Sequence, residues 1–264
     1  MGGLDIENLR KAWNAHHPRD PIPAGGTAHV RSALAERTKE DCNGEACWAN
    51  LPFVKSDLAA REALKRAHRP LAPQMWKSNP EEWLTSDDIE AAMEQYERVF
   101  PHFLFLGASP IDFDARPAEK GGRCVWSKLC NLDLARELRK GKTDIGVIFN
   151  ADPHYKDGSH WMALFVDLKE GYILYFDSTG DPMPREVTRL TKRLQAQGEA
   201  MGSPLRLIVS RAKHQRRNTE CGIYGLYAIS QLLQGKRTPE SLTRGRISDD
   251  AMFRFRKHFF NLPE

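Results

Sequence analysis

Four residues in the middle and C-terminal parts of the chain have the side chains that a cysteine hydrolase needs. In chain order they are His160, Asp177, Gln215 and Cys221. An imidazole can act as a base, a carboxylate can orient it, a side-chain amide can donate to an oxyanion and a thiol can attack a carbonyl. No other part of the sequence indicates a reaction, so these four are our candidate catalytic residues.

Taken singly, each of the four also has a structural explanation. A histidine beside Trp161 is usually packed, an aspartate at the end of a strand usually caps a turn, and a cysteine before an apolar helix usually lies in the core. Asp167 is an alternative acid, but it ends the wrong strand, next to a turn. The common order of the four residues, and the elements that would carry them, favour catalysis.

A predicted hairpin brings the histidine and the aspartate together. Segments 162–168 and 172–177 are rich in apolar and aromatic residues, which predicts strands, and the short link between them predicts an antiparallel pair. With the turn centred on Glu170, Asp177 lies opposite Ala163, close after His160. The carboxylate can then hold one ring nitrogen and leave the other to face the thiol.

The thiol precedes a segment, 223–233, that is apolar on nearly every side and therefore predicts a buried helix. At the start of a helix, unpaired N–H groups and the helix dipole favour a thiolate at Cys221. Gly222 would leave room for a substrate carbonyl. Gln215 can donate to the oxyanion together with the Cys221 N–H.

The remaining pattern predicts an α+β fold with one mixed sheet around the buried helix. Further strands are expected at 144–150 and 205–210, and helices at 28–39, 56–68, 85–100, 131–140, 184–198 and 248–259. Thr85 and Asp88 have the spacing of a capping box. The Pro-rich segment 69–73 predicts a boundary between a helical N-terminal arm, 1–72, and a catalytic core, 73–264.

Composition sets broad limits. The chain has 264 residues, 41% of them hydrophobic, and a net charge of +4 that allows an acidic partner without requiring one. Its longest apolar runs are too short to cross a bilayer, its first residues lack the order of a signal peptide, and Ile6 breaks a myristoylation signal. Five cysteines, an odd number, predict free thiols in a reducing compartment, and their spacing disfavours a zinc site.

A basic loop leads to the thiol and contains Arg211, Lys213, Arg216 and Arg217. Such a cluster is usually a solvated surface. It could also form a lip for an acidic substrate, or make a weak contact with DNA. No helix-turn-helix or aromatic RNA-binding motif accompanies it.

The four residues and their neighbours resemble a known family. His160-Trp161, Asp177, Gln215 and Cys221-Gly222 have the order and spacing of the ubiquitin-like-protein (SUMO) proteases and the adenovirus endopeptidase. Segment 82–89 is similar to the entry helix of those enzymes, and the resemblance covers about 75–260. It implies the papain-like fold of SUMO proteases, no cofactor, no metal, and a catalytic set of His160, Asp177, Gln215 and Cys221.

Three segments, 79–84, 105–113 and 247–260, are closest to the polyprotein-processing proteases of large double-stranded DNA viruses, of the asfarvirus type. Those enzymes also carry a helical N-terminal arm. Their third catalytic residue is usually described as Asn, whereas this chain has Asp177.

The family resemblance implies cleavage after Gly-Gly. Two facing indoles, Trp83 and Trp161, would leave a slot that admits only residues without side chains, with Gly222 beside it. Trp83 has the alternative explanation of a core anchor at the start of a helix.

The predicted function is therefore a thiol endopeptidase that cleaves viral structural polyproteins during virion maturation, in the host cytoplasm and the virion, and is not secreted. One alternative is an isopeptidase that removes SUMO, ubiquitin or a related modifier. A second is an inactive scaffold that binds Gly-Gly tails, and a third is acyl transfer from a cofactor by the same thiol.

Overall fold

The computed structural model describes residues 3–42 and 45–261, with side chains for all of these except 3–4, 45–46 and 65–68. The chain folds as two compact units. One consists of residues 3–71 together with 258–261, and the other of residues 72–257. None of the helices in the described ranges is long and apolar enough to span a bilayer.

The N-terminal unit is helical and has a hydrophobic core of its own. Its elements are α1 (Gly3–His16), α2 (Thr27–Thr38), the 3₁₀ helix η1 (Glu45–Asn50), α3 (Pro52–Lys55) and α4 (Leu58–His68). Trp13 and Trp48 lie in this core with Leu9, Val30 and Phe53. The indole N–H of Trp48 is buried and donates to Thr38 Oγ1 at 2.9 Å, so the large ring leaves no unpaired polar atom in the core.

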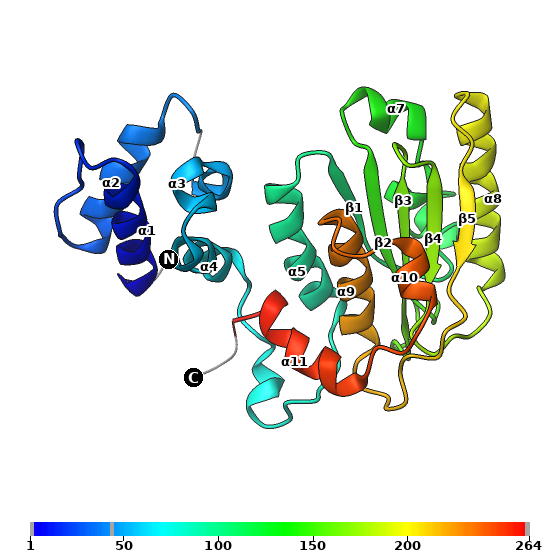
Figure 1. The fold of residues 1–264 in the computed structure, drawn as a ribbon. Helices are drawn as coiled ribbons and strands as arrows, with labels where there is room; N and C mark the ends of the chain where they lie inside the picture. The colour runs from blue at the N-terminus through cyan, green and yellow to red at the C-terminus, as the bar shows by residue number, and fades with distance from the viewer. Residues whose placement is uncertain (1–2, 43–44, 262–264) are drawn as a thin grey trace. The chain divides into compact units, whose positions relative to one another are not determined.

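The second unit contains a five-stranded mixed sheet in the order β1-β2-β3-β4-β5 (Figure 1). Its strands are β1 (Phe103–Pro110), β2 (Asp144–Asn150), β3 (Trp161–Asp167), β4 (Tyr172–Phe176) and β5 (Arg206–Val209). The two outer pairs, β1 with β2 and β4 with β5, are parallel, and the inner pairs are antiparallel. The other elements are η2 (Gln74–Lys77), α5 (Ser86–Val99), η3 (Ala118–Lys120), α6 (Ser127–Cys130), α7 (Leu134–Arg139), α8 (Arg185–Ala200), α9 (Cys221–Leu233), α10 (Pro239–Thr243) and α11 (Asp249–Phe259). The predicted α+β class is confirmed.

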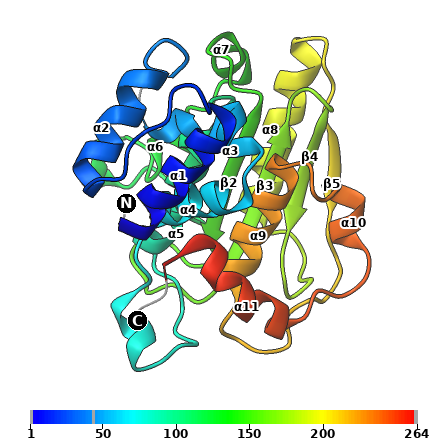
Figure 2. The ribbon, with the colours of Figure 1, turned by 60° about the vertical axis from the view of Figure 1, so that its left-hand side comes forward.

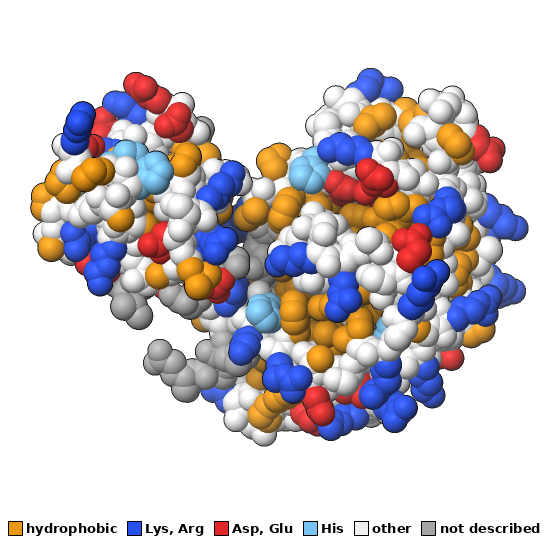
Figure 3. All heavy atoms as spheres, in the orientation of Figure 1, with side chains coloured by type: hydrophobic (Ala, Val, Ile, Leu, Met, Phe, Trp, Pro, Cys, Tyr) orange, Lys and Arg blue, Asp and Glu red, His pale blue; other side chains and the backbone are white. Residues whose placement is uncertain are grey.

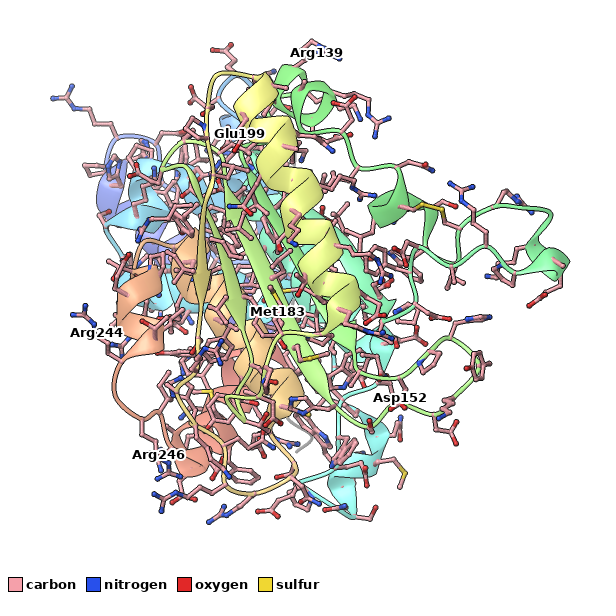
Figure 4. The ribbon with its side chains drawn as sticks, turned by 90° about the vertical axis from the view of Figure 1, so that its right-hand side faces the viewer. Arg139, Asp152, Met183, Glu199, Arg244 and Arg246 are labelled. Carbon is pink, nitrogen blue, oxygen red and sulfur yellow. A yellow bond between two sulfur atoms is a disulfide. The ribbon has the colours of Figure 1, made fainter. Side chains whose placement is uncertain are left out.

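Helices cover both faces of the sheet. α8 contributes Val187, Leu190 and Leu194 to a core cluster on one face. α9 packs on the other face, and every one of its residues is buried. Figures 1 and 2 show α9 in front of the sheet, and Figure 4, from the side, shows α8 on the near face of the sheet with α9 behind it. A helix buried all round needs apolar residues all round, which is the pattern its sequence has.

Small residues on β2 and α9 allow close packing between the sheet and α9. A Cβ on Gly146 in β2 would lie 3.0 Å from two ring carbons of Phe103 in β1 and 3.3 Å from Ile229 in α9. On α9, a Cβ on Gly225 would lie 3.4 Å from Ile148, an ordinary contact distance. Gly146 is therefore the tighter of these two positions.

The predicted elements are mostly found, with three corrections. Ala163 pairs with Phe176, so the hairpin register differs by one residue from the prediction that placed Asp177 opposite Ala163. The expected helix at 131–140 is α7 alone, because Asp133 caps a new helix by accepting from the Arg136 N–H. Strand β1 was not predicted. The capping box of Thr85 and Asp88 at the start of α5 is confirmed.

The cysteine prediction is wrong for four of the five residues. Cys42 is bonded to Cys47, and Cys124 to Cys130. Each bond closes a short loop, with Cα–Cα distances of 5.6 and 6.3 Å, within the usual range for a disulfide. The odd number of cysteines does not indicate whether cysteines that are close in the sequence form disulfides. Cys221 is free and buried.

Candidate active site

The hairpin β3–β4 brings the predicted base and acid into contact. His160 directly precedes β3, and Asp177 directly follows β4. His160 Nε2 lies 2.8 Å from Asp177 Oδ1, although the two residues are 17 apart in the sequence. The carboxylate therefore fixes the plane of the imidazole and leaves Nδ1 for another partner.

The carboxylate is itself held in place. Its side chain is 2% exposed, against 21% for that of His160. Asp177 Oδ1 also accepts the backbone N–H of Thr179 at 2.9 Å. Asp177 thus stays oriented toward the imidazole while the imidazole keeps an open side. Asp167, the alternative acid, caps the hairpin turn by accepting from the N–H groups of Lys169 and Glu170, and does not take part in this arrangement.

Cys221 is the first residue of α9, and it lies near enough to His160 to affect the pKa of the imidazole. Burial lowers the pKa of His160, but hydrogen bonds and charge attraction from Asp177 and Cys221 raise it by more, to about 10. The raised pKa favours the protonated imidazole at neutral pH. A thiol beside a protonated imidazole at a helix N-terminus is suited to act as a nucleophile.

Gln215 lies in the connection between β5 and α9 and is held by the residue after the acid. Its backbone N–H donates to Ser178 O at 2.8 Å, and its side-chain Oε1 accepts the Ser178 hydroxyl at 2.7 Å. Gln215 and Ser178 are both buried. The side-chain amide therefore has its oxygen engaged, which directs its nitrogen, a donor, elsewhere.

Trp161 and Gly222 pack together at the start of α9. The indole N–H of Trp161 is buried and donates to Leu84 O at 3.1 Å. A Cβ on Gly222 would lie 3.1 Å from Leu84 Cδ1 and 3.4 Å from Trp161 Cδ1. The missing side chain thus makes room for Leu84 and Trp161, and a substrate contact at Gly222 stays a prediction. Trp83 is half-buried on the same segment as Leu84.

Two sets of contacts that hold the site residues in place were not predicted from the sequence. His214, fully buried beside Gln215, contacts Leu242 O through Nε2 at 3.0 Å and accepts the Ile247 N–H at Nδ1. Burial lowers the pKa of His214, and it is neutral in this setting. The second support is a buried ion pair between Glu220, the residue before the thiol, and Arg256 in α11. These residues lie in stretches rich in polar and charged side chains, so nothing in the local sequence distinguishes them.

The basic loop is exposed at Arg211, Lys213, Arg216 and Arg217. Arg217 forms an ion pair with Asp250 at 2.9 Å. Figure 4 shows Arg244 and Arg246 on the outer side of the connection between α10 and α11, and Figure 3 shows that Lys and Arg side chains are widely spread over the surface of this unit. A contact of this loop with DNA stays a prediction. Within 3–42 and 45–261, no group of three or more His, Cys, Asp or Glu side chains is placed to hold a metal ion.

The fold and the site together define the class of protein. A mixed sheet that carries an imidazole–carboxylate pair at the edge of a hairpin, beside a thiol at the start of a buried helix, is the arrangement of a cysteine hydrolase.

Comparison with known proteins shows which proteases the chain is similar to. The model of the Ulp1 protease family, C-terminal catalytic domain, matches residues 145–262. Over 254 residues the chain is 27% identical to the cysteine protease S273R of African swine fever virus, and the match covers 88% of both chains. Over 160 residues it is 31% identical to the thiol protease R355 of Acanthamoeba polyphaga mimivirus, covering 60% of this chain and 50% of that one. The chain thus spans about half the length of the mimivirus protein.

A solved structure shows the same fold. The crystal structure of the African swine fever virus pS273R protease matches with a TM-score of 0.65 and 23% identity, and the match covers 94% of this chain and 95% of that one. Residues 145–262 are thus similar to the catalytic domain of the Ulp1 proteases, and the relatives of this chain include viral cysteine proteases.

Proposed function

We propose that this protein cleaves the peptide bond after Gly-Gly pairs in viral structural polyproteins during virion maturation, with Cys221 as nucleophile. The contact of His160 with Asp177, close to Cys221 at the start of the buried helix α9, is the observation that carries the proposal. The match along 88% of a viral cysteine protease supports the viral setting. The host cytoplasm and the virion are the proposed locations.

In the proposed reaction, the Cys221 thiolate attacks the carbonyl carbon of the scissile bond. The carbonyl oxygen becomes an oxyanion that accepts from the Gln215 side-chain amide and the Cys221 N–H. As the intermediate collapses, the His160 imidazolium gives its proton to the leaving amine, which departs and leaves a thioester. The now neutral imidazole then takes a proton from water, which attacks the thioester, and the product acid leaves with regeneration of the thiol.

We further propose that Trp83 and Trp161 select glycine. Trp161 is fixed by its hydrogen bond to Leu84 O and lies against Gly222, directly after the nucleophile. Trp83 comes from the neighbouring segment and retains some exposure. A substrate strand between an anchored indole and a second indole would have no room for side chains at the two residues before the cleaved bond.

The first test uses peptide cleavage. Cys221→Ala and His160→Ala are expected to abolish cleavage of a Gly-Gly-Xaa peptide, and Asp177→Asn to reduce it less, because the amide oxygen can still accept the imidazole N–H. Full activity of either alanine variant would exclude the mechanism. An intact fold of each variant, checked by circular dichroism, is the control.

Modifier removal is a second candidate. The African swine fever virus relative from a second isolate carries the name SUMO-1 cysteine protease. Incubating the enzyme with a viral structural polyprotein and, in parallel, with a SUMO fusion that ends in Gly-Gly separates the two functions. Faster processing of the polyprotein supports our proposal, and exclusive processing of the fusion contradicts it.

A further inference from the structure

The residue after the acid has no role in the mechanism as described so far. Ser178 is 1% exposed, and its hydroxyl donates to Gln215 Oε1 at 2.7 Å. Its backbone carbonyl accepts the N–H groups of His214 at 2.9 Å and Gln215 at 2.8 Å. One residue thus holds both the backbone and the side chain of the proposed oxyanion donor, which lies 37 residues later in the sequence.

The direction of the side-chain hydrogen bond has a chemical consequence. A carboxamide has an acceptor oxygen and a donor nitrogen that are nearly equal in size, and rotation by half a turn exchanges them. A rotated Gln215 would present its oxygen to the developing oxyanion and repel it. In the rotated amide the nitrogen could still donate to the Ser178 hydroxyl oxygen, but the buried hydroxyl hydrogen would lose Oε1 as its acceptor. The observed rotamer, which leaves the nitrogen for substrate, is therefore favoured.

We propose that Ser178 is a positioning residue that sets the orientation of the Gln215 amide for oxyanion stabilisation. Asp177 and Ser178 then act as one unit at the end of β4: the first orients the imidazole, and the second orients the amide. This inference rests on the proposed oxyanion role of Gln215.

The experiment is a double-mutant cycle with Ser178→Ala, Gln215→Ala and the double variant of the full chain. Steady-state kcat and KM are measured on a Gly-Gly-Xaa peptide. Losing an oxyanion donor costs a factor of about 100 or more in kcat. We expect Gln215→Ala to show that loss, Ser178→Ala to lower kcat about tenfold with KM little changed, and the double variant to match Gln215→Ala.

A second readout separates this role from a structural one. Alkylation of Cys221 by iodoacetamide forms an S–C bond and releases iodide, so no oxyanion develops. We expect the alkylation rate to stay within about twofold of the wild type in all three variants. An equal loss of alkylation and cleavage in Ser178→Ala would show that Ser178 acts on the thiol or on the fold, and would overturn the proposal.

The remaining outcomes are also decisive. If the kcat losses of the two single variants multiply in the double variant, Ser178 does not act through Gln215, and the proposal is contradicted. Wild-type kcat in Ser178→Ala, with Gln215→Ala defective, excludes the inference alone, whereas wild-type kcat in Gln215→Ala excludes the proposed oxyanion donor itself. If Ser178→Ala does not fold, Ser178→Thr and Ser178→Val provide a pair of equal shape. The threonine variant, which keeps the hydroxyl, should then be about tenfold faster, and this difference should vanish when Gln215 is alanine.

Discussion

Arg256 neutralises the carboxylate that directly precedes the nucleophile. Its Nε lies 3.0 Å from Glu220 Oε2 and its Nη2 lies 2.8 Å from Glu220 Oε1, with both side chains almost fully buried. Arg256 Nη1 also donates to Pro80 O and Glu82 O, each at 2.9 Å, and the guanidinium stacks on Trp76. The segment that leads to Trp83 is therefore tied to the start of the helix that carries the thiol.

Replacing this arginine should destabilise the protein strongly. Arg256→Met leaves a buried carboxylate without its partner, which typically costs about 3–5 kcal/mol in the free energy of unfolding. Urea denaturation at pH 7 measures the change. Arg254→Met, at an exposed position of the same helix, is the matched control and should have little effect.

The destabilisation by Arg256→Met should also depend on pH. Burial already raises the pKa of Glu220 above its ordinary 4.5, against the opposing effect of Arg256, and removal of the guanidinium should raise it further. A raised pKa means that the deficit is small below pH 4.5, where the carboxyl is protonated in both states, and grows as pH rises through the folded-state pKa. A deficit that is equal at pH 4 and pH 7 would show that lost packing, and not charge, dominates.

The imidazolium should set the alkaline limit of activity. The pKa of His160 is raised from 6.5 to about 10, so kcat/KM should hold through mildly alkaline pH and fall as His160 loses its proton. Asp177→Asn keeps a hydrogen bond but removes a charge, which should lower this pKa and shift the alkaline limb to lower pH. Identical alkaline limbs in the two proteins would contradict this assignment.

The interaction of His160 with Asp177 should also make the stability of the protein depend on pH. Because the folded-state pKa of His160 is raised, its stabilising contribution is complete below pH 6.5 and is lost as pH rises toward 10. The free energy of unfolding of the wild type, minus that of Asp177→Asn, should therefore shrink over this range. Chemical denaturation of both proteins at pH 6, 8 and 10 measures it.

Much of the fold could be predicted because most elements have a clear periodicity. The hairpin, the buried helix and the capping box at Thr85 are local patterns, and these are found close to where they were expected. Strand β1 was missed because Gly107 and Pro110 are typical of turns. It is an edge strand, which tolerates a proline, and it has a bulge in the region of Gly107, where the ring of Trp126 leaves no room for a Cβ.

The supports of the site could not be predicted for a different reason. His160, Asp177 and Cys221 have side chains with a recognisable chemistry and a recognisable order. The role of Ser178 depends on a partner 37 residues away, and Arg256 reaches a carbonyl 176 residues earlier in the chain. Such contacts depend on the packing of the whole unit, and no local sequence pattern predicts them.

Acidic pH should lower the free energy of unfolding through protonation of His214. Burial, and to a lesser degree the charge of Arg246, lower the pKa of His214 below 6.5, while its hydrogen bond to Leu242 opposes them. A lowered histidine pKa gives a stabilising contribution that is complete above pH 6.5 and is lost as pH falls below it. His214→Gln keeps a donor and an acceptor without this titration. The difference in unfolding free energy between wild type and variant should therefore fall between pH 7.5 and pH 5, and a constant difference would contradict the prediction.

Two glycines that face the interior between the sheet and α9 should respond oppositely to alanine. At Gly146 the new Cβ would lie 3.0 Å from the Phe103 ring, and overpacking of this kind typically costs about 1–3 kcal/mol. At Gly225 the nearest atom, in Ile148, is 3.4 Å away, and alanine in a helix interior is favoured over glycine by about 0.5–1 kcal/mol. Thermal unfolding of both variants compares them directly. If Gly225→Ala proved the more damaging, α9 would lie closer to the sheet than these distances allow, and the placement of Cys221 at its first residue would have to shift with it.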